Sequence, residues 1–106
     1  MRRAAKTDAN HAEIRDFVRK LGAYWLDMFQ LKNCCDGVVV YKGEVVAVEV
    51  KDGSKPPSKR HLTDGEREFA AAWTAAGGKF AVIESTRQVV DLVNQMNARS
   101  LARPDN

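Results

Sequence analysis

Two Val-rich segments joined by a Lys-Gly pair constrain the fold of this 106-residue chain more than any other feature. The segments are residues 37–41 and 44–50, and Lys42-Gly43 lies between them. Val favours β-strands, and a two-residue loop that contains Gly favours a tight turn. The pattern therefore predicts a β-hairpin in which Tyr41 pairs with Glu44.

The register of this hairpin brings charged side chains together at its open end. Counting outward from the turn, Asp36 lies opposite Glu49, and opposed residues have Cβ atoms about 4.5–5.5 Å apart on one face of a sheet. Lys51 follows Glu49 by two positions, so it shares that face. We expect two carboxylates and one ammonium to meet at this end of the hairpin.

The rest of the chain predicts the element order α-β-β-β-α-β-α. Thr7 or Asp8 caps the first helix, which runs to about Leu21 and stops at Gly22. Further strands are expected at 23–29 and 79–84, and further helices at 63–76 and 86–99. A capping box, Thr63 to Glu66, opens the first of these helices, and a second one, Ser85 to Gln88, opens the other. The last helix is expected to fray by Arg99.

This order predicts a mixed α/β fold, in which helices pack on a four-stranded mixed sheet. The fourth strand is reached through a helical crossover and should lie parallel to an earlier strand. Residues 1–106 are expected to form a single domain, with flexible ends at 1–6 and 100–106.

The composition is that of an ordinary globular chain, and no apolar run approaches the ~20 residues that span a bilayer. No signal-peptide pattern follows the basic first residues, so we expect no membrane partner and a cytoplasmic location. The net charge of +3 is compatible with a nucleic-acid partner. The adjacent Cys34 and Cys35 suit neither a disulfide nor a zinc site, and are expected to be a buried or half-buried thiol pair.

The charged cluster suits the hydrolysis of a phosphodiester bond. The carboxylates of Asp36 and Glu49 would bind a hard divalent cation such as Mg²⁺, with the Val50 carbonyl as a third ligand. Such a cation activates water and stabilises charge on a phosphate. Lys51 would position or deprotonate that water, or neutralise the developing charge. The alternative is a cross-strand salt bridge, worth ~0–1 kcal/mol.

Several linear motifs resemble a known family. They are residues 7–14 ahead of the first helix, Cys35-Asp36-Gly37, and residues 48–63, Val-Glu-Val-Lys-Asp-Gly-Ser-Lys-Pro-Pro-Ser-Lys-Arg-His-Leu-Thr. On these residues the chain resembles the PD-(D/E)XK nuclease superfamily, and within it the small stand-alone VRR-NUC-type proteins of phages and bacteria. The resemblance implies a restriction-endonuclease-like core and an endonuclease that depends on Mg²⁺ or Mn²⁺.

The resemblance also implies roles for individual residues. In that family the residues that match Asp36, Glu49 and Lys51 carry catalysis, and the one that matches Glu13 often adds a carboxylate to the metal site, directly or through water. Read from the sequence alone, Glu13 is a surface carboxylate near the positive end of a helix dipole. Relatives of this size resemble Holliday-junction resolvases, which implies a homodimer that acts on branched DNA in a bacterial cell or a phage-infected host.

Two positions depart from the family pattern. Cys35 stands where the motif usually has Pro, a residue that shapes the backbone and takes no part in the chemistry. Glu66 stands where many members have Gln. Glu66 also completes a capping box, which is the role we favour, whereas a position facing the cation would add a negative charge to the site.

Basic residues flank the expected site and are expected to contact DNA phosphates, which gives affinity with little sequence information. They are Lys55, Lys59 and Arg60 in the loop after Lys51, and Arg2, Arg3 and Lys6 in the N-terminal arm. Other polar and aromatic positions are expected to have no part in binding. These are His11 and His61, expected to be exposed, and Tyr24, Trp25 and Trp73, expected in the core.

Two other functions stay open at this point. The chain would be a non-catalytic DNA-binding module if it kept the nuclease fold without cutting, although a pure binder has no need for Asp36, Glu49 and Lys51 together. It would be a protein-interaction domain of a phage or mobile-element assembly if it had no affinity for DNA at physiological salt.

Overall fold

A four-stranded sheet forms the centre of the protein, in a computed structural model that describes residues 8–104. The strands lie in the order β1-β2-β3-β4; the first three are antiparallel, and β4 runs parallel to β3. The predicted α/β class and the parallel fourth strand are confirmed. In chain order the elements are α1 (His11–Lys20), β1 (Tyr24–Asp27), β2 (Gly37–Tyr41), β3 (Glu44–Val50), the 3₁₀ turn η1 (Pro57–Lys59), α2 (Asp64–Ala75), β4 (Lys79–Ile83) and α3 (Thr86–Ala102).

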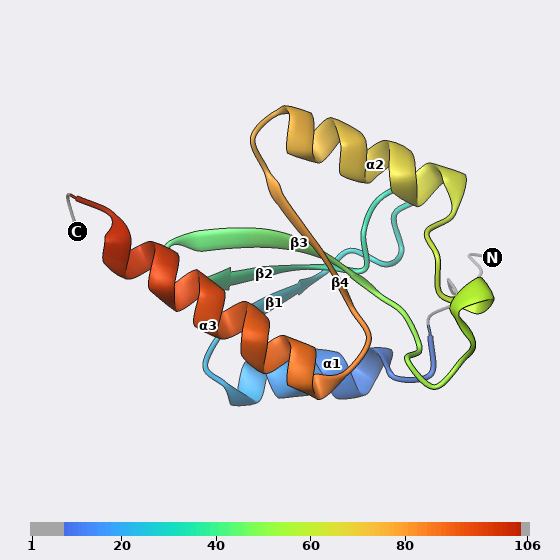
Figure 1. Cartoon of the computed structure of the whole chain (residues 1–106), viewed down its shortest axis with the longest axis horizontal. Helices are drawn as coiled ribbons and strands as arrows, with labels where there is room; N and C mark the ends of the chain where they lie inside the picture. Colours follow the sequence, from blue (N-terminus) through green and yellow to red (C-terminus); the bar gives the residue numbers. More distant parts are fainter. Residues whose placement is uncertain (1–7, 105–106) are drawn as a thin grey trace.

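The helices lie on both sides of the sheet, with α1 and α3 along one side and α2 on the other, beside β4 (Figure 1). The core lies between the sheet and the α1–α3 pair. It contains the fully buried side chains of Ile14, Val18, Trp25, Val39, Val48, Val89 and Met96. By contrast α2 has no fully buried residue, and its Phe69 and Trp73 stack on each other next to Phe80 of β4. No helix within residues 8–104 has the length and apolar composition needed to cross a membrane.

The hairpin has the predicted strands and register. β2 pairs with β3 from Tyr41–Glu44 at the turn to Gly37–Val48 at the open end. Lys42 and Gly43 both have positive φ, 50° and 80°, as a two-residue turn of type I′ requires. β3 has a neighbour on each side, and this interior position explains its apolar residues on both faces.

The first helix begins later than predicted. Asn10, and not Thr7 or Asp8, is the N-cap residue of α1, and Thr7 lies outside the described residues. The side chain of Asn10 makes no cap hydrogen bond and reaches the sheet instead. Its Nδ2 donates to the carbonyls of Lys51 and Glu84, at 3.1 and 3.2 Å. This contact spans 41 and 74 residues of chain, so no local pattern reveals it.

Two strands are shorter than predicted, and β1 differs most. It spans Tyr24–Asp27 and not 23–29, because the chain turns after Met28, where the Leu31 N–H donates to the Met28 carbonyl. β4 ends at Ile83, one residue before the predicted end. The face assignments within β1 also differ from expectation. Trp25 is 1% exposed, as expected of a core residue, but its neighbour Tyr24 lies on the opposite face and is 61% exposed.

The last helix is longer than predicted. α3 continues to Ala102 and does not fray at Arg99. Arg99 and Arg103 both pair with the carboxylate of Glu44, at 2.7 and 2.8 Å. These pairs attach the end of α3 to the hairpin turn, although residues 100–106 were expected to be flexible.

One of the two predicted capping boxes is complete. At α2 the Thr63 hydroxyl accepts the Glu66 N–H while the Glu66 carboxylate accepts the Thr63 N–H. At α3 the Ser85 hydroxyl accepts the Gln88 N–H, but the Gln88 side chain accepts the N–H of Glu84 in place of that of Ser85. The second box is therefore only half formed.

Candidate active site

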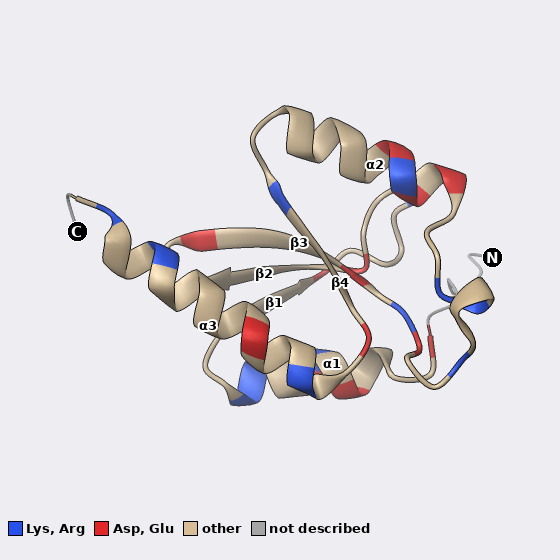
Figure 2. Ribbon diagram, viewed as in Figure 1, with Lys and Arg blue, Asp and Glu red and all other residues tan. Residues whose placement is uncertain are grey.

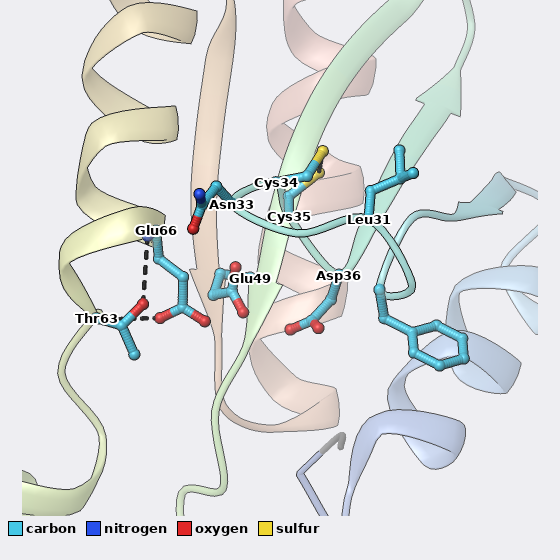
Figure 3. A pocket seen from close by; sticks show the side chains of 9 residues that line it. Leu31, Asn33, Cys34, Cys35, Asp36, Glu49, Thr63 and Glu66 are labelled. Atoms are coloured by element: carbon cyan, nitrogen blue, oxygen red, sulfur yellow. Dashed lines mark hydrogen bonds between the residues drawn. The ribbon is translucent and has the colours of Figure 1, made fainter. Parts of the chain in front are cut away.

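The open end of the hairpin carries a small polar cavity of about 150 Å³. Gly37 pairs with Val48, so Asp36 and Glu49 are the next residues on the two strands. Both side chains line the cavity together with Glu66 at the start of α2. Figure 3 shows Glu49 between Asp36 and Glu66, with the three carboxylates turned toward one another. The hairpin and one helix therefore collect three acidic groups in one place.

Asp36 is held by the neighbouring strand. Its Oδ2 accepts the backbone N–H of Val50 at 2.7 Å, and its own N–H donates to the Val48 carbonyl at 3.0 Å. The Asp36 side chain is only 14% exposed. Because Oδ2 is engaged with the backbone, Oδ1 is the oxygen that is left for other partners.

Glu49 is buried beside two other carboxyl groups. It is 3% exposed. Burial, followed by hydrogen bonding to Asp36 and the negative charge of Asp36 and Glu66, raises the pKa of Glu49 to about 10. In the absence of a cation Glu49 therefore keeps its proton at neutral pH. A carboxyl group whose pKa is shifted this far by burial and charged neighbours marks a candidate functional site.

Lys51 shares the face of Glu49 and supplies a positive charge. Its Nζ lies 2.9 Å from Oε1 of Glu66. Burial alone would lower the pKa of Lys51, but the hydrogen bond and the charge of Glu66 outweigh it, so the pKa is raised. Burial would likewise raise the pKa of Glu66, but Lys51 and the Thr63 N–H together lower it. The pair is therefore charged at neutral pH.

Glu66 has both of the roles that the sequence left as alternatives. It closes the capping box of α2, the role favoured from the sequence, through a 2.8 Å bond from the Thr63 N–H. The same oxygen accepts a hydrogen bond from the Lys51 ammonium, and the Glu66 side chain lines the cavity. The helix cap thus also sets the position of Lys51.

The donor set fits a hard cation that keeps much of its water. Asp36 Oδ1 and the carboxyl group of Glu49 are oxygen donors at the cavity, and the crowding of three carboxyl groups is relieved by a cation. Within residues 8–104, no three His, Cys, Asp or Glu side chains form a ready ligand cluster. Mg²⁺ is commonly held by only one or two carboxylates plus water, so the pair is sufficient for this ion. The Val50 carbonyl, proposed as a third ligand, lies on the backbone next to the N–H that Asp36 accepts.

Glu13, the residue expected from the first helix, lies away from the cavity in this structure. Glu13 is exposed on α1 and does not line the cavity. Asp8, just before the helix, lies 3.9 Å from Nζ of Lys55. Burial raises the pKa of Asp8, and the positive charges of Lys51 and Lys55 oppose this effect. The sequence did not identify Asp8 as a site residue, because its short side chain also fits a helix cap.

The expectation for one of the two histidines is wrong. His11 is 4% exposed, whereas His61 is exposed as expected. His11 Nε2 lies 3.5 Å from Oδ1 of Asp27, and its Nδ1 lies 4.0 Å from Oδ1 of Asp36. The Asp27 carboxylate also accepts the indole N–H of Trp25, and these hydrogen bonds lower its pKa although burial opposes them. A signal was present in the sequence, since position 11 precedes the apolar residues 14 and 18 at helical spacing.

The thiol pair lies at the edge of the cavity. Cys35 is buried and Cys34 is half-buried, as predicted, and their Sγ atoms are 4.0 Å apart. Burial, followed by the neighbouring Cys34, raises the pKa of Cys35 to about 12. The Cys35 thiol donates to the Gly37 carbonyl at 3.4 Å. Cys35 therefore acts as a packing residue in front of Asp36.

The basic loop leaves the sheet directly after Lys51 and runs beside the site (Figure 2). Two of its three basic residues already have a carboxylate partner. Lys55 lies near Asp8, and Arg60 donates to Glu84 at 3.2 Å. Lys59 is exposed and has no carboxylate partner within residues 8–104. The remaining predicted phosphate contacts lie outside the described residues: Arg2, Arg3 and Lys6.

Comparison with known proteins adds no neighbour to this description. No protein-family model matches the chain, and no curated protein or solved structure matches it significantly.

Proposed function

We propose that this protein is a metal-dependent DNA endonuclease of the PD-(D/E)XK type, as its resemblance to the VRR-NUC proteins implies. One observation carries the proposal. Asp36 and Glu49 lie side by side at the open end of a hairpin, and Lys51 follows on the same face, paired with Glu66, whose carboxylate lines the cavity. Two carboxylates that can hold a divalent cation and a nearby ammonium support the hydrolysis of a phosphodiester bond.

Each residue has a defined task in this proposal. Asp36 and Glu49 would hold Mg²⁺ or Mn²⁺ with the Val50 carbonyl and water, and the bound ion supplies an activated water and charge stabilisation. Lys51 orients the attacking water or neutralises charge on the phosphate, and Glu66 fixes the Lys51 ammonium in place. Asp36 is kept in its rotamer by the Val50 N–H, so its free oxygen stays directed at the cavity.

The substrate class follows from the charged surroundings. Lys59 is available to contact a DNA phosphate. Lys55 and Arg60 would give up their carboxylate partners, Asp8 and Glu84, and contact a phosphate instead when DNA is bound. Arg2, Arg3 and Lys6 precede the site in the chain and would add to this surface. Phosphate contacts of this kind select the shape of DNA more than its sequence, which suits branched DNA in the cytoplasm of a bacterial cell or a phage-infected host.

A homodimer would cut both strands of such a substrate. The sheet face opposite to α1 and α3 supports this part of the proposal, because α2 covers only its β4 side. Tyr24, Leu26 and Val45 are between 43% and 61% exposed there, and strand alternation places all three on this face. Exposed apolar patches of this kind mark protein contacts. Size-exclusion chromatography with light scattering tests it: a monomer at all concentrations contradicts the dimer.

A cleavage assay tests the activity itself. A Holliday junction, a flap and a linear duplex are each incubated with Mg²⁺, Mn²⁺ or EDTA, and the products are compared for the wild type, Glu49→Ala and Lys51→Ala. We expect nicking of the branched substrates with either metal and none with EDTA. Each variant should lose at least about 100-fold in rate, the size of a positioned acid–base or metal contribution.

The opposite results separate the alternatives. Equal cleavage by wild type and variants means that a contaminating nuclease is responsible and contradicts the proposal. Salt-sensitive DNA binding that is unaffected by EDTA and by Glu49→Ala, with no cleavage, identifies a non-catalytic DNA-binding module.

A further inference from the structure

His11 is a buried polar side chain with one nitrogen that lacks a partner. It is 4% exposed, and its ring lies edge-on against Trp25 and Phe29, with ring centroids 5.7 and 5.2 Å away. Nδ1 is fully buried and forms no hydrogen bond. Since a buried polar atom without a partner costs about 1–3 kcal/mol, its position calls for an explanation.

The unpartnered nitrogen is directed at the candidate site. Nδ1 lies 4.0 Å from Oδ1 of Asp36, which is the oxygen that the Val50 N–H leaves free. The other nitrogen, Nε2, lies 3.5 Å from Asp27, whose carboxylate is in turn held by the Trp25 indole. His11 therefore lies in a row between a fixed carboxylate and the one that would bind the cation. A separation of 4.0 Å is longer than a direct hydrogen bond, so Nδ1 faces Oδ1 at close range without donating to it.

We propose that His11 is a positioning residue that fixes the free oxygen of Asp36 through its Nδ1. The inference rests on the proposed function, because it concerns the carboxylate that would hold the metal. Asp27, Trp25 and Phe29 determine the orientation of the ring, and Nδ1 adds a second constraint on the Asp36 carboxylate beside the hydrogen bond from the Val50 N–H. Residues in such a second layer around a metal ligand typically change metal affinity by about 10–100-fold when they are replaced.

Two conservative substitutions distinguish this role from simple packing. An Asn side chain places a polar atom where histidine has Nδ1, whereas a Gln side chain places one where histidine has Nε2. His11→Asn therefore keeps the group that faces Asp36, and His11→Gln keeps the one that faces Asp27. If the ring only fills space, both variants have the same effect on the site.

The measurement is the binding of Mn²⁺ and of Mg²⁺ by isothermal titration calorimetry, without DNA, for wild type, both His11 variants and Glu49→Ala. Far-UV circular dichroism and urea unfolding establish that each variant is folded. We expect His11→Gln to lose at least about 10-fold in affinity. His11→Asn should stay within about 3-fold of wild type, since it retains the atom that faces Asp36.

The outcomes separate failure of this inference from failure of the proposed function. Equal losses, or none, in the two folded His11 variants overturn the positioning role, while metal binding by wild type that is lost in Glu49→Ala leaves the site itself intact. Absence of metal binding by wild type, or equal binding by Glu49→Ala, overturns the proposed function. If neither His11 variant folds, Asp27→Asn tests the inference in their place. Asp27 is more than one-third exposed and therefore tolerates the change. Asp27→Asn should weaken metal binding because the His11 ring is held less firmly. An unchanged metal affinity in Asp27→Asn also overturns the inference.

Discussion

Oε1 of Glu66 lies 2.9 Å from the ammonium of Lys51 and 2.8 Å from the backbone nitrogen of Thr63. One carboxylate oxygen thus joins the start of α2 to the end of β3. The capping box that forms this helix end therefore also places a carboxylate beside the lysine of the candidate site.

Two variants separate these roles of Glu66. Glu66→Gln keeps an oxygen for the Thr63 N–H but removes the negative charge, so burial should then dominate and lower the pKa of Lys51. Thr63→Ala should leave the pKa of Lys51 unchanged and lower the free energy of unfolding by about 1 kcal/mol through loss of the cap. Side-chain NMR of labelled lysine measures the pKa, and urea unfolding measures stability. An unchanged Lys51 pKa in Glu66→Gln contradicts the coupling.

Glu49 should make the protein less stable as the pH rises, in the presence of EDTA. Folded Glu49 keeps its proton up to a pKa of about 10, whereas an unfolded glutamic acid loses it near 4.5. Between these values the folded state holds more protons, so the free energy of unfolding falls with increasing pH. The slope reaches at most about 1.4 kcal/mol per pH unit.

Glu49→Gln is the matched control for this pH effect, because it mimics the protonated group and cannot ionise. The free energy of unfolding of Glu49→Gln is measured in urea from pH 5 to 9. It should fall less steeply with pH than that of the wild type, and at pH 8.5 it should be the higher of the two. Identical pH profiles of the two proteins are incompatible with a buried, protonated Glu49.

Gly37 should not tolerate a side chain, because the indole of Trp25 occupies the space where its Cβ would be. Gly37→Ala is expected to lower the free energy of unfolding by about 1–3 kcal/mol through overpacking. In a double-mutant cycle with Trp25→Leu the two losses should not add, since the smaller side chain makes room for the methyl group. Additive losses in urea unfolding would show that the two residues do not compete for space.

Asn10 should act through its amide hydrogens and not as a helix cap. Asn10→Asp keeps a residue that is equally good at an N-cap, but it replaces the donor by a carboxylate facing the Lys51 and Glu84 carbonyls. Asn10→Ala only removes the two hydrogen bonds, at a cost of about 1–3 kcal/mol. Urea unfolding should therefore rank Asn10→Asp below Asn10→Ala, and the reverse order would assign a capping role to Asn10.

Lys59 and Arg60 should differ in their effect on DNA binding. Lys59 is exposed without a carboxylate partner in the described part of the chain, so Lys59→Ala should reduce the slope of log affinity against log salt by about 1. Arg60 must first leave Glu84, so Arg60→Ala should change the slope less. Fluorescence anisotropy with a labelled junction at several salt concentrations measures both, and equal slopes for wild type and Lys59→Ala exclude a phosphate contact.

The predictions that proved exact to the residue depend on neighbours in the chain. The hairpin register follows from the two-residue turn, and the cap of α2 follows from Thr63 and Glu66, three residues apart. Contacts between distant segments were not predictable in this way. Asn10 meets Lys51 across 41 residues, and Arg99 meets Glu44 across 55. Both contacts lie near helix ends that the sequence placed differently.

In the candidate site, too, local patterns were predictable and contacts between distant segments were not. Asp36, Glu49 and Lys51 were found from the hairpin alone, because strand alternation fixes which side chains share a face. From the first helix, Glu13 was expected at the site and His11 was expected to be exposed, although the helical spacing of position 11 with the apolar positions 14 and 18 pointed to the buried face. Packing decides: His11 is enclosed by Trp25 and Phe29, and Glu13 remains exposed.

The absence of any fully buried side chain in α2 has a consequence for the motions of the protein. Detaching α2 from the sheet exposes little apolar surface, so it should need much less free energy than global unfolding. Such an opening separates Glu66 from Lys51 and uncovers Glu49 to solvent. Amide hydrogens in α2 should therefore exchange faster than those in α1 and β3. We therefore expect the wall of the cavity that α2 forms to move. The hairpin that carries Asp36 and Glu49 forms the fixed wall.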